Sequence, residues 1–231
     1  PFSQAVTHAG SHAGYYPGAL QLTLKILYHP ETGKLWGAQA VGFDGVDKRI
    51  DVIAAYIRKE GTVHDLAEFE QAYAPPFSSA KDPVNMTGFI AENVLDGMSK
   101  TIVWRDIETL RTNGAFFLDV RSPEEFALGA IPGALNIPHT QLRSRLAEVP
   151  KDRTIVVNCA IGLRGYLADR MLRQNGYNDT ANLTGGYKTW KAATTELFRL
   201  STPDAPAEAR KEAAREVADD GRPIGPLSDK L

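Results

Sequence analysis

The sequence predicts an α/β protein made of two globular segments followed by a charged tail. Over residues 100–199, expected strands and helices alternate, which is typical of a small, mainly parallel sheet with helices on both faces. The strand cores at 115–120 and 154–159 are continuously apolar, as expected where both faces of a sheet are covered. Residues 1–99 instead combine a hairpin with helices, which predicts an α+β segment.

The clearest pattern in the first segment is at residues 20–28, where alternating polar and apolar side chains predict a strand. Residues 35–42 return as a second strand after a turn that contains Pro30 and Gly33, which predicts a hairpin. Helices follow, with apolar residues at helical spacing. They are expected at 46–59, in a short segment capped by Thr62, and at 83–95.

The second segment adds helices and one weak strand to its two apolar strands. The helices are expected at 105–112, 123–128, 164–175 and 187–194, and the weak strand at 181–184. The tail carries a run at 207–218 with charges on every side, which favours a solvated linker over a docked helix. We therefore expect domains over 1–99 and 100–199, with a linker or tail over 200–231.

Composition excludes several classes of protein. The 231 residues contain 43% hydrophobic and 23% charged residues, as an ordinary globular protein does. The net charge of +4 over residues 100–200 favours small anionic ligands and is too small to predict nucleic-acid binding. The sequence has no run long enough to span a membrane and no signal peptide, so we expect a cytoplasmic protein. Because the chain starts with Pro1, we interpret it as a fragment or a processed product.

The single cysteine, Cys159, lies at the end of an apolar strand and before a glycine-containing loop. One thiol excludes an internal disulfide and a cysteine-rich zinc site, and the isolated histidines give no reason to expect a metal. Loop amides, the start of the following helix and Arg164 are placed to favour the thiolate. Gly162 and Gly165 are expected to permit the tight turn. The alternative is an inert buried cysteine, which this placement does not favour.

These residues resemble the active-site loop of rhodanese domains, which reads CxxGxRG. The stretches 118–126, 129–138 and 183–190 resemble further rhodanese signatures, with Ala130 where the family usually has His. The resemblance implies that Cys159 carries a persulfide sulfur whose charge Arg164 and the loop amides hold. The loop residues implied in this role are Ala160, Ile161, Gly162, Leu163 and Gly165.

Three stretches of the first segment, 11–18, 45–51 and 72–78, resemble the dimerisation domain of coenzyme A-disulfide reductases in the pyridine nucleotide-disulfide oxidoreductase family. That domain contributes tyrosines to the partner subunit's flavin and CoA site, which implies such a role for Tyr15, Tyr16 and Tyr73. The alternative is that these tyrosines only brace turns. The resemblance also implies that this domain is truncated at its start.

Together the resemblances imply a homodimeric, FAD- and NAD(P)H-dependent reductase of CoA disulfide, CoA persulfide or polysulfide, with an attached rhodanese sulfurtransferase. No GxGxxG fingerprint occurs in the sequence, so we expect this chain alone to bind neither cofactor. Thiosulfate, polysulfide and CoA persulfide are the implied sulfur substrates. Two alternatives stay open: a rhodanese enzyme with a simple dimerisation module, and a non-catalytic rhodanese fold used for interaction.

Overall fold

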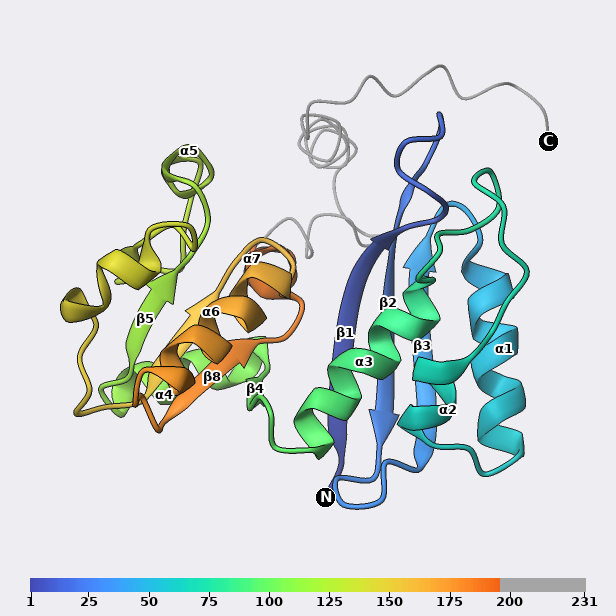
Figure 1. Ribbon diagram of the computed structural model, residues 1–231, viewed down its shortest axis with the longest axis horizontal. Coiled ribbons are helices and arrows are strands. Elements are labelled where there is room, and N and C mark those ends of the chain that lie inside the picture. Colours follow the sequence, from blue (N-terminus) through green and yellow to red (C-terminus); the bar gives the residue numbers. More distant parts are fainter. Residues whose placement is uncertain (196–231) are drawn as a thin grey trace, which may run out of the picture. The chain divides into compact units, whose positions relative to one another are not determined.

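The computed structural model describes residues 1–195, and its first region is an antiparallel three-stranded sheet with helices on one face (Figure 1). The strands lie in the order β1-β2-β3, and both pairings are antiparallel. The elements are β1 (Ser3–Gly10), β2 (Gln21–Tyr28), β3 (Leu35–Gly42), α1 (Val46–Arg58), α2 (Val63–Glu68) and α3 (Pro83–Leu95). The hairpin and the three helices agree with the sequence prediction.

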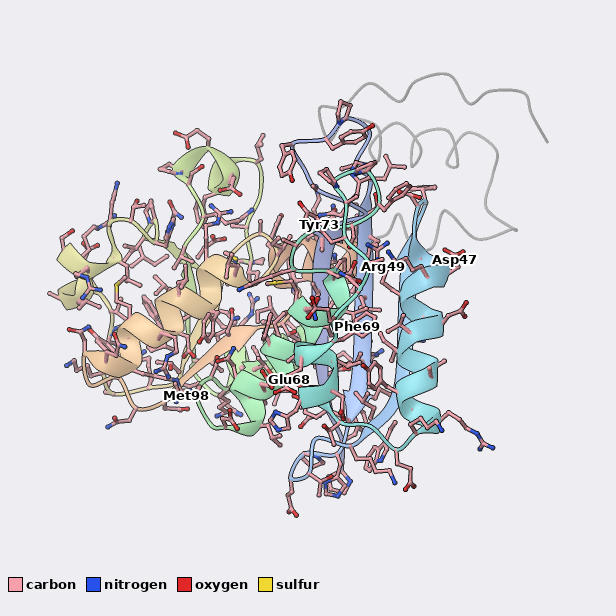
Figure 2. The ribbon with its side chains drawn as sticks, turned by 45° about the vertical axis from the view of Figure 1, so that its right-hand side comes forward. Asp47, Arg49, Glu68, Phe69, Tyr73 and Met98 are labelled. Carbon is pink, nitrogen blue, oxygen red and sulfur yellow. The ribbon has the colours of Figure 1, made fainter. Side chains whose placement is uncertain are left out.

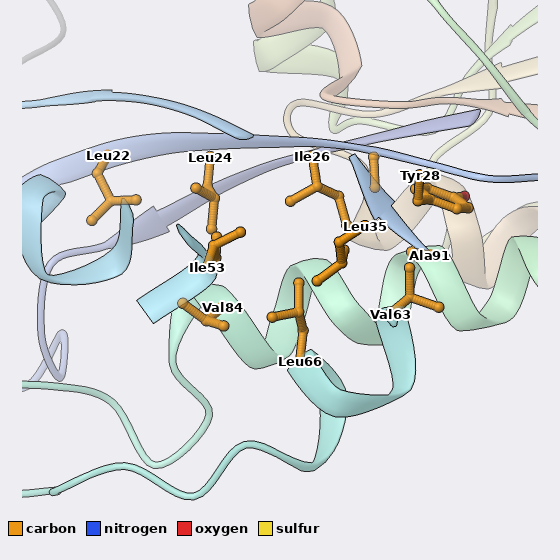
Figure 3. Packing of buried hydrophobic residues seen from close by; sticks show 11 residues of the cluster. Leu22, Leu24, Ile26, Tyr28, Leu35, Ile53, Val63, Leu66, Val84 and Ala91 are labelled. Carbon is orange, nitrogen blue, oxygen red and sulfur yellow. The ribbon is translucent and has the colours of Figure 1, made fainter. Parts of the chain in front are cut away.

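The core of this region forms between β2 and the helices. Alternate residues of β2 point toward the helices, where they meet Ile53 of α1, Leu66 of α2 and Val84 of α3 (Figure 3). The period-two pattern of β2 therefore buries one complete face of the strand. The residues of β2 that do so are Leu22, Leu24, Ile26 and Tyr28.

The helix boundaries follow from local hydrogen bonds. At the start of α2, the carboxylate of Asp65 accepts from the backbone N–H of Thr62 at 2.6 Å and from its hydroxyl at 2.8 Å. At the start of α3, Asp82 accepts from the backbone N–H of Val84 at 3.0 Å, and Pro83 occupies the first turn. Both arrangements satisfy amide groups that a helix start leaves unpaired.

Within residues 1–195, the second region is a five-stranded parallel sheet with the strand order β4-β8-β7-β5-β6. The strands are β4 (Thr101–Ile102), β5 (Phe116–Asp119), β6 (Leu135–Asn136), β7 (Ile155–Asn158) and β8 (Thr180–Leu183). The helices are η1 (Trp104–Asp106), α4 (Ile107–Thr112), α5 (Pro123–Ala127), η2 (Leu142–Ser144), η3 (Leu146–Glu148), α6 (Leu163–Gln174) and α7 (Gly186–Thr194). The predicted α/β class and the parallel sheet are confirmed.

Strand β7 lies between β5 and β8, and all four of its residues are buried, as its continuous apolar sequence predicts. Side chains of β5 and β7 pack with Ala168 and Leu172 of α6 in a single core. Because all strands are parallel, their carboxyl ends meet at one edge of the sheet. The residues that follow β5, β7 and β8 are therefore brought to the same edge.

Three of the strands were not predicted from the sequence. β1 contains mostly small and polar residues, and its eight-residue pairing with β2 defines it. β4 and β6 have two residues each, which is too short for a periodic pattern. The helix expected at 105–112 divides into the short η1 and α4. The expected linker over 200–231, including the run at 207–218, lies outside the described residues.

Candidate functional site

Cys159 directly follows β7 and is buried at the carboxyl edge of the parallel sheet. The start of α7 holds the loop: the backbone N–H of Tyr187 donates to the carbonyl of Cys159 at 2.8 Å, and that of Lys188 to Ala160 at 3.0 Å. Gly186 makes this approach possible. Its φ is 60°, and a Cβ there would lie 2.5 Å from the carbonyl oxygen of Cys159. A glycine is therefore required behind Cys159.

The loop turns so that an amide faces the sulfur. The backbone N–H of Gly162 donates to the Sγ of Cys159 at 3.1 Å, and Gly162 has a φ of 125°, which favours glycine. The side-chain amide of Asn182 on β8 donates to the carbonyl of Gly162 at 3.2 Å and fixes this turn. Gly162 therefore has the conformational role expected from the sequence.

Gly165 has a different role from the one expected. It lies in the regular backbone of α6, without a positive φ, so it does not form the tight turn. A Cβ at this position would collide with the Oδ1 of Asn182. Gly165 therefore allows α6 to approach β8 closely, which is a steric requirement.

Arg164 lies in the first turn of α6 and forms a two-pronged ion pair with Glu125 of α5. Its Nη1 donates to Oε2 and its Nη2 to Oε1, both at 2.6 Å. Hydrogen bonding from Arg164 lowers the pKa of Glu125 to about 2. Hydrogen bonding to Glu125 raises the pKa of Arg164, and the nearby Cys159 sulfur adds to that shift. The pair therefore stays ionised at neutral pH, with the guanidinium beside the cysteine.

Glu125 is itself held by its helix. The backbone N–H of Ser122 donates to Oε2 of Glu125 at 2.9 Å, and the N–H of Glu125 donates to the Ser122 hydroxyl at 3.3 Å. The residue before Ser122, the buried Arg121, forms an ion pair with Asp119 at 2.6 Å. Arg121 also donates to the carbonyls of Glu125 at 3.2 Å and Gly129 at 2.7 Å. The end of β5 thus fixes α5, and α5 fixes the partner of Arg164.

In the first region, the structure joins two of the three tyrosines. The hydroxyl oxygens of Tyr15 and Tyr73 lie 2.7 Å apart, and both side chains are exposed. This hydrogen bond raises the pKa of Tyr73. Tyr16 instead packs edge-on against His12, with ring centroids 5.7 Å apart. The pair Tyr15–Tyr73 is therefore a unit from which Tyr16 is separate.

A buried ion pair organises the loops that carry these tyrosines. Arg49, near the start of α1 (Figure 2), donates to the carboxylate of Asp82 at 2.6 Å and to the carbonyl of Ser11 at 2.7 Å. Ser78 also donates to Asp82 at 2.8 Å, and its carbonyl accepts from the N–H of Ala13 at 3.0 Å. Arg49 therefore connects all three stretches that the sequence analysis selected in this segment.

Sequence reasoning found Cys159 and Arg164 but missed the groups that hold them. Glu125 lies 39 residues from Arg164, and its signals in the sequence were a capping sequence, Ser-Pro-Glu-Glu, and its place in the stretch 118–126, which indicated no pairing with Arg164. Asn182 gave no signal in the sequence, because its role depends on the packing of β8. Gly186 belongs to the stretch 183–190, but its contact with Cys159 depends on the packing of α7. Among residues 1–195, no three His, Cys, Asp or Glu side chains gather as a metal site requires.

Comparison with known families identifies both regions. Residues 3–83 match the pyridine nucleotide-disulphide oxidoreductase dimerisation domain, and residues 101–193 match the rhodanese-like domain. The chain therefore joins a dimerisation domain of this oxidoreductase class to a rhodanese-like domain. This order of domains agrees with the resemblance to fusions of coenzyme A disulfide reductase with rhodanese that the sequence implied.

Individual relatives agree with this assignment. The chain is 48% identical to reduced CoADR-RHD from Bacillus anthracis, with a TM-score of 0.81, over 83% of this chain and 34% of that one. It is 37% identical to an NAD-dependent persulfide reductase from A. fulgidus, with a TM-score of 0.72, over 82% and 34%. Coenzyme A disulfide reductase of Staphylococcus epidermidis is 49% identical over 83 residues, 36% of this chain and 19% of that protein.

The chain spans about a third of those two structures and about a fifth of the curated reductase. None of the helices within residues 1–195 is long and apolar enough to cross a membrane.

Proposed function

We propose that the second region is a rhodanese-type sulfurtransferase in which Cys159 carries the transferred sulfur. The observation that carries this proposal is the 3.1 Å hydrogen bond from the Gly162 amide to Sγ, beside the guanidinium of Arg164. Both groups can stabilise negative charge on the sulfur, including the charge of a persulfide.

The reaction has two sulfur-transfer steps. The thiolate of Cys159 attacks the sulfane sulfur of a donor, an S–S bond forms, and the donor's bond to that sulfur breaks with its electron pair on the leaving group. An acceptor nucleophile then attacks the outer sulfur and releases the Cys159 thiolate. No external oxidant or reductant is needed, because the sulfane sulfur keeps its oxidation state.

Thiocyanate formation from thiosulfate and cyanide tests this function. The wild-type chain is expected to form thiocyanate and Cys159→Ser is expected to form none, because the chain has no second thiol. Activity in Cys159→Ser would overturn the sulfurtransferase proposal.

We infer further that the first region serves a reductase in the full-length homodimer. The pair Tyr15–Tyr73 is exposed and held by buried contacts, which fits a role toward a group outside this chain. FAD and NAD(P)H would supply the electrons for reduction of CoA disulfide, CoA persulfide or polysulfide. A phenolic hydroxyl near a departing thiolate can donate a hydrogen bond or a proton to it. The test is activity of the full-length dimer with Tyr73→Phe, described in the Discussion.

A further inference from the structure

The cysteine loop, residues 159–165, contains a single basic residue, and its charge is already paired. Both terminal nitrogens of Arg164 bind Glu125 at 2.6 Å. The low pKa of Glu125, which the hydrogen bonds from Arg164 produce, keeps this carboxylate ionised at neutral pH. An incoming dianion therefore meets a guanidinium whose charge is balanced by Glu125 and two of whose N–H groups are already engaged.

The other side chains at the loop are apolar. We call Ile161, Leu163 and Leu167 the loop rim; they are 36%, 57% and 47% exposed. Leu163 and Leu167 are four residues apart in α6, so they lie on the same side of the helix. The side chains of the loop rim give a sulfonate oxygen no hydrogen-bond donor, whereas they can pack against an alkyl or aryl group of a donor.

We propose that the sulfur donor of Cys159 carries its sulfane sulfur on an apolar organic group with a single negative charge, and that Glu125 sets this preference by neutralising Arg164. This inference rests on the proposed sulfur transfer at Cys159. Glu125 acts through Arg164, so it is a specificity-determining residue and contacts no reacting atom.

Two sulfur donors that react through the same type of S–S bond allow the effect of donor charge to be measured apart from the reaction chemistry. Benzenethiosulfonate transfers its outer sulfur to the Cys159 thiolate and leaves as benzenesulfinate, and thiosulfate does the same and leaves as sulfite. In both cases the new S–S bond forms as the donor's S–S bond breaks, and the persulfide anion remains on Cys159. Benzenethiosulfonate has one negative charge and an aryl group, whereas thiosulfate has two negative charges and no organic group.

The test is the ratio of kcat/KM for benzenethiosulfonate to that for thiosulfate, with cyanide as acceptor. Because the donors differ in intrinsic reactivity, the change in this ratio between variants is the informative quantity. Glu125→Gln, which keeps an oxygen for the Ser122 amide, is expected to lower the ratio about tenfold, mainly through a lower KM for thiosulfate. Glu124→Gln removes the same charge from the same helix without touching Arg164, and its ratio should equal the wild-type ratio.

A second variant tests the same idea without disturbing the ion pair. Leu163→Lys adds a cation to the loop rim and is expected to favour thiosulfate, whereas Leu163→Gln is expected to lack that gain. An unchanged ratio in both Glu125→Gln and Leu163→Lys would overturn the inference while leaving sulfur transfer intact. If neither donor placed a sulfur on Cys159 of the wild-type chain, the sulfurtransferase proposal itself would fail, and the inference with it.

Discussion

The hydroxyl oxygens of Tyr15 and Tyr73 share a 2.7 Å hydrogen bond across 58 residues of sequence. One hydroxyl donates and the other accepts, so the pair presents a single remaining proton to its surroundings. The two tyrosines are therefore expected to act as one group in any reaction they assist.

Tyr15→Phe and Tyr73→Phe should each slow CoA-disulfide or persulfide reduction by the full-length dimer, by about tenfold or more. Because the hydroxyls form one unit, the double variant should lose little more than either single variant. Steady-state reductase kinetics measure this effect. Tyr16→Phe is the matched control, and thiocyanate formation at Cys159 should stay near wild type in all variants. Strictly additive losses would show that the hydroxyls act independently, and a parallel loss of both activities would overturn the assignment to a separate site.

The ion pair of Arg49 and Asp82 should dominate the stability of the first region. Their side chains are 1% and 0% exposed, so Asp82→Asn leaves a buried guanidinium without its counter-charge. We expect a loss of about 3–5 kcal/mol in the free energy of unfolding, measured by urea denaturation. Glu60→Gln breaks the exposed pair with Lys34 and should leave the free energy of unfolding nearly unchanged. Equal effects of the two substitutions would contradict the organising role of Arg49.

Gly186→Ala should disable the cysteine loop. The added Cβ would lie 2.5 Å from the carbonyl of Cys159, at a φ of 60°, so the loop must shift away from α7. Thiocyanate formation should fall by at least about tenfold, since misplacing a nucleophile by about 1 Å costs more than that. Gly133→Ala is the control, because its φ of 81° gives similar backbone strain while nothing lies within 4 Å. Retention of full activity in Gly186→Ala would show that α7 does not fix the nucleophile.

His8 should make the protein less stable in mild acid. Burial lowers the pKa of this imidazole to about 4, from an ordinary value of 6.5. His8 therefore binds a proton near pH 6.5 in the unfolded chain but only near pH 4 in the folded chain. Stability should be constant above pH 6.5 with respect to this group and fall by about 2–3 kcal/mol between pH 6.5 and 4.

Urea denaturation of the wild type and His8→Gln across this pH range measures the effect of His8. The glutamine variant should show a smaller decline. Identical pH profiles for His8→Gln and the wild type would contradict the expected contribution of His8.

The parts of this structure that the sequence predicted are those specified by neighbours in the chain. The short helix capped by Thr62 was predictable because its partner, Asp65, is three residues away. Strand β7 and the following loop were predictable because a buried apolar run ends in a cysteine and a glycine turn. In each case the physical signal lies within one short window.

The parts that escaped prediction depend on distant packing. Arg164 of the cysteine loop pairs with Glu125, which only the folding of α5 against β5 brings to it. Gly165 was assigned a conformational role because its contact with Asn182 of β8 is invisible in the sequence. Strand β1 lacks large apolar residues, so its place is determined by pairing with β2.

The central claim, that Cys159 is a sulfur carrier, is tested most directly by intact-protein mass spectrometry after incubation with a sulfane-sulfur donor. The wild-type chain should gain the mass of one sulfur atom and lose it again when cyanide is added. Because the chain has a single thiol, Cys159→Ser should gain nothing. A wild-type chain that gains no sulfur from thiosulfate, polysulfide or benzenethiosulfonate, or a Cys159→Ser chain that gains as much as the wild type, would contradict the account.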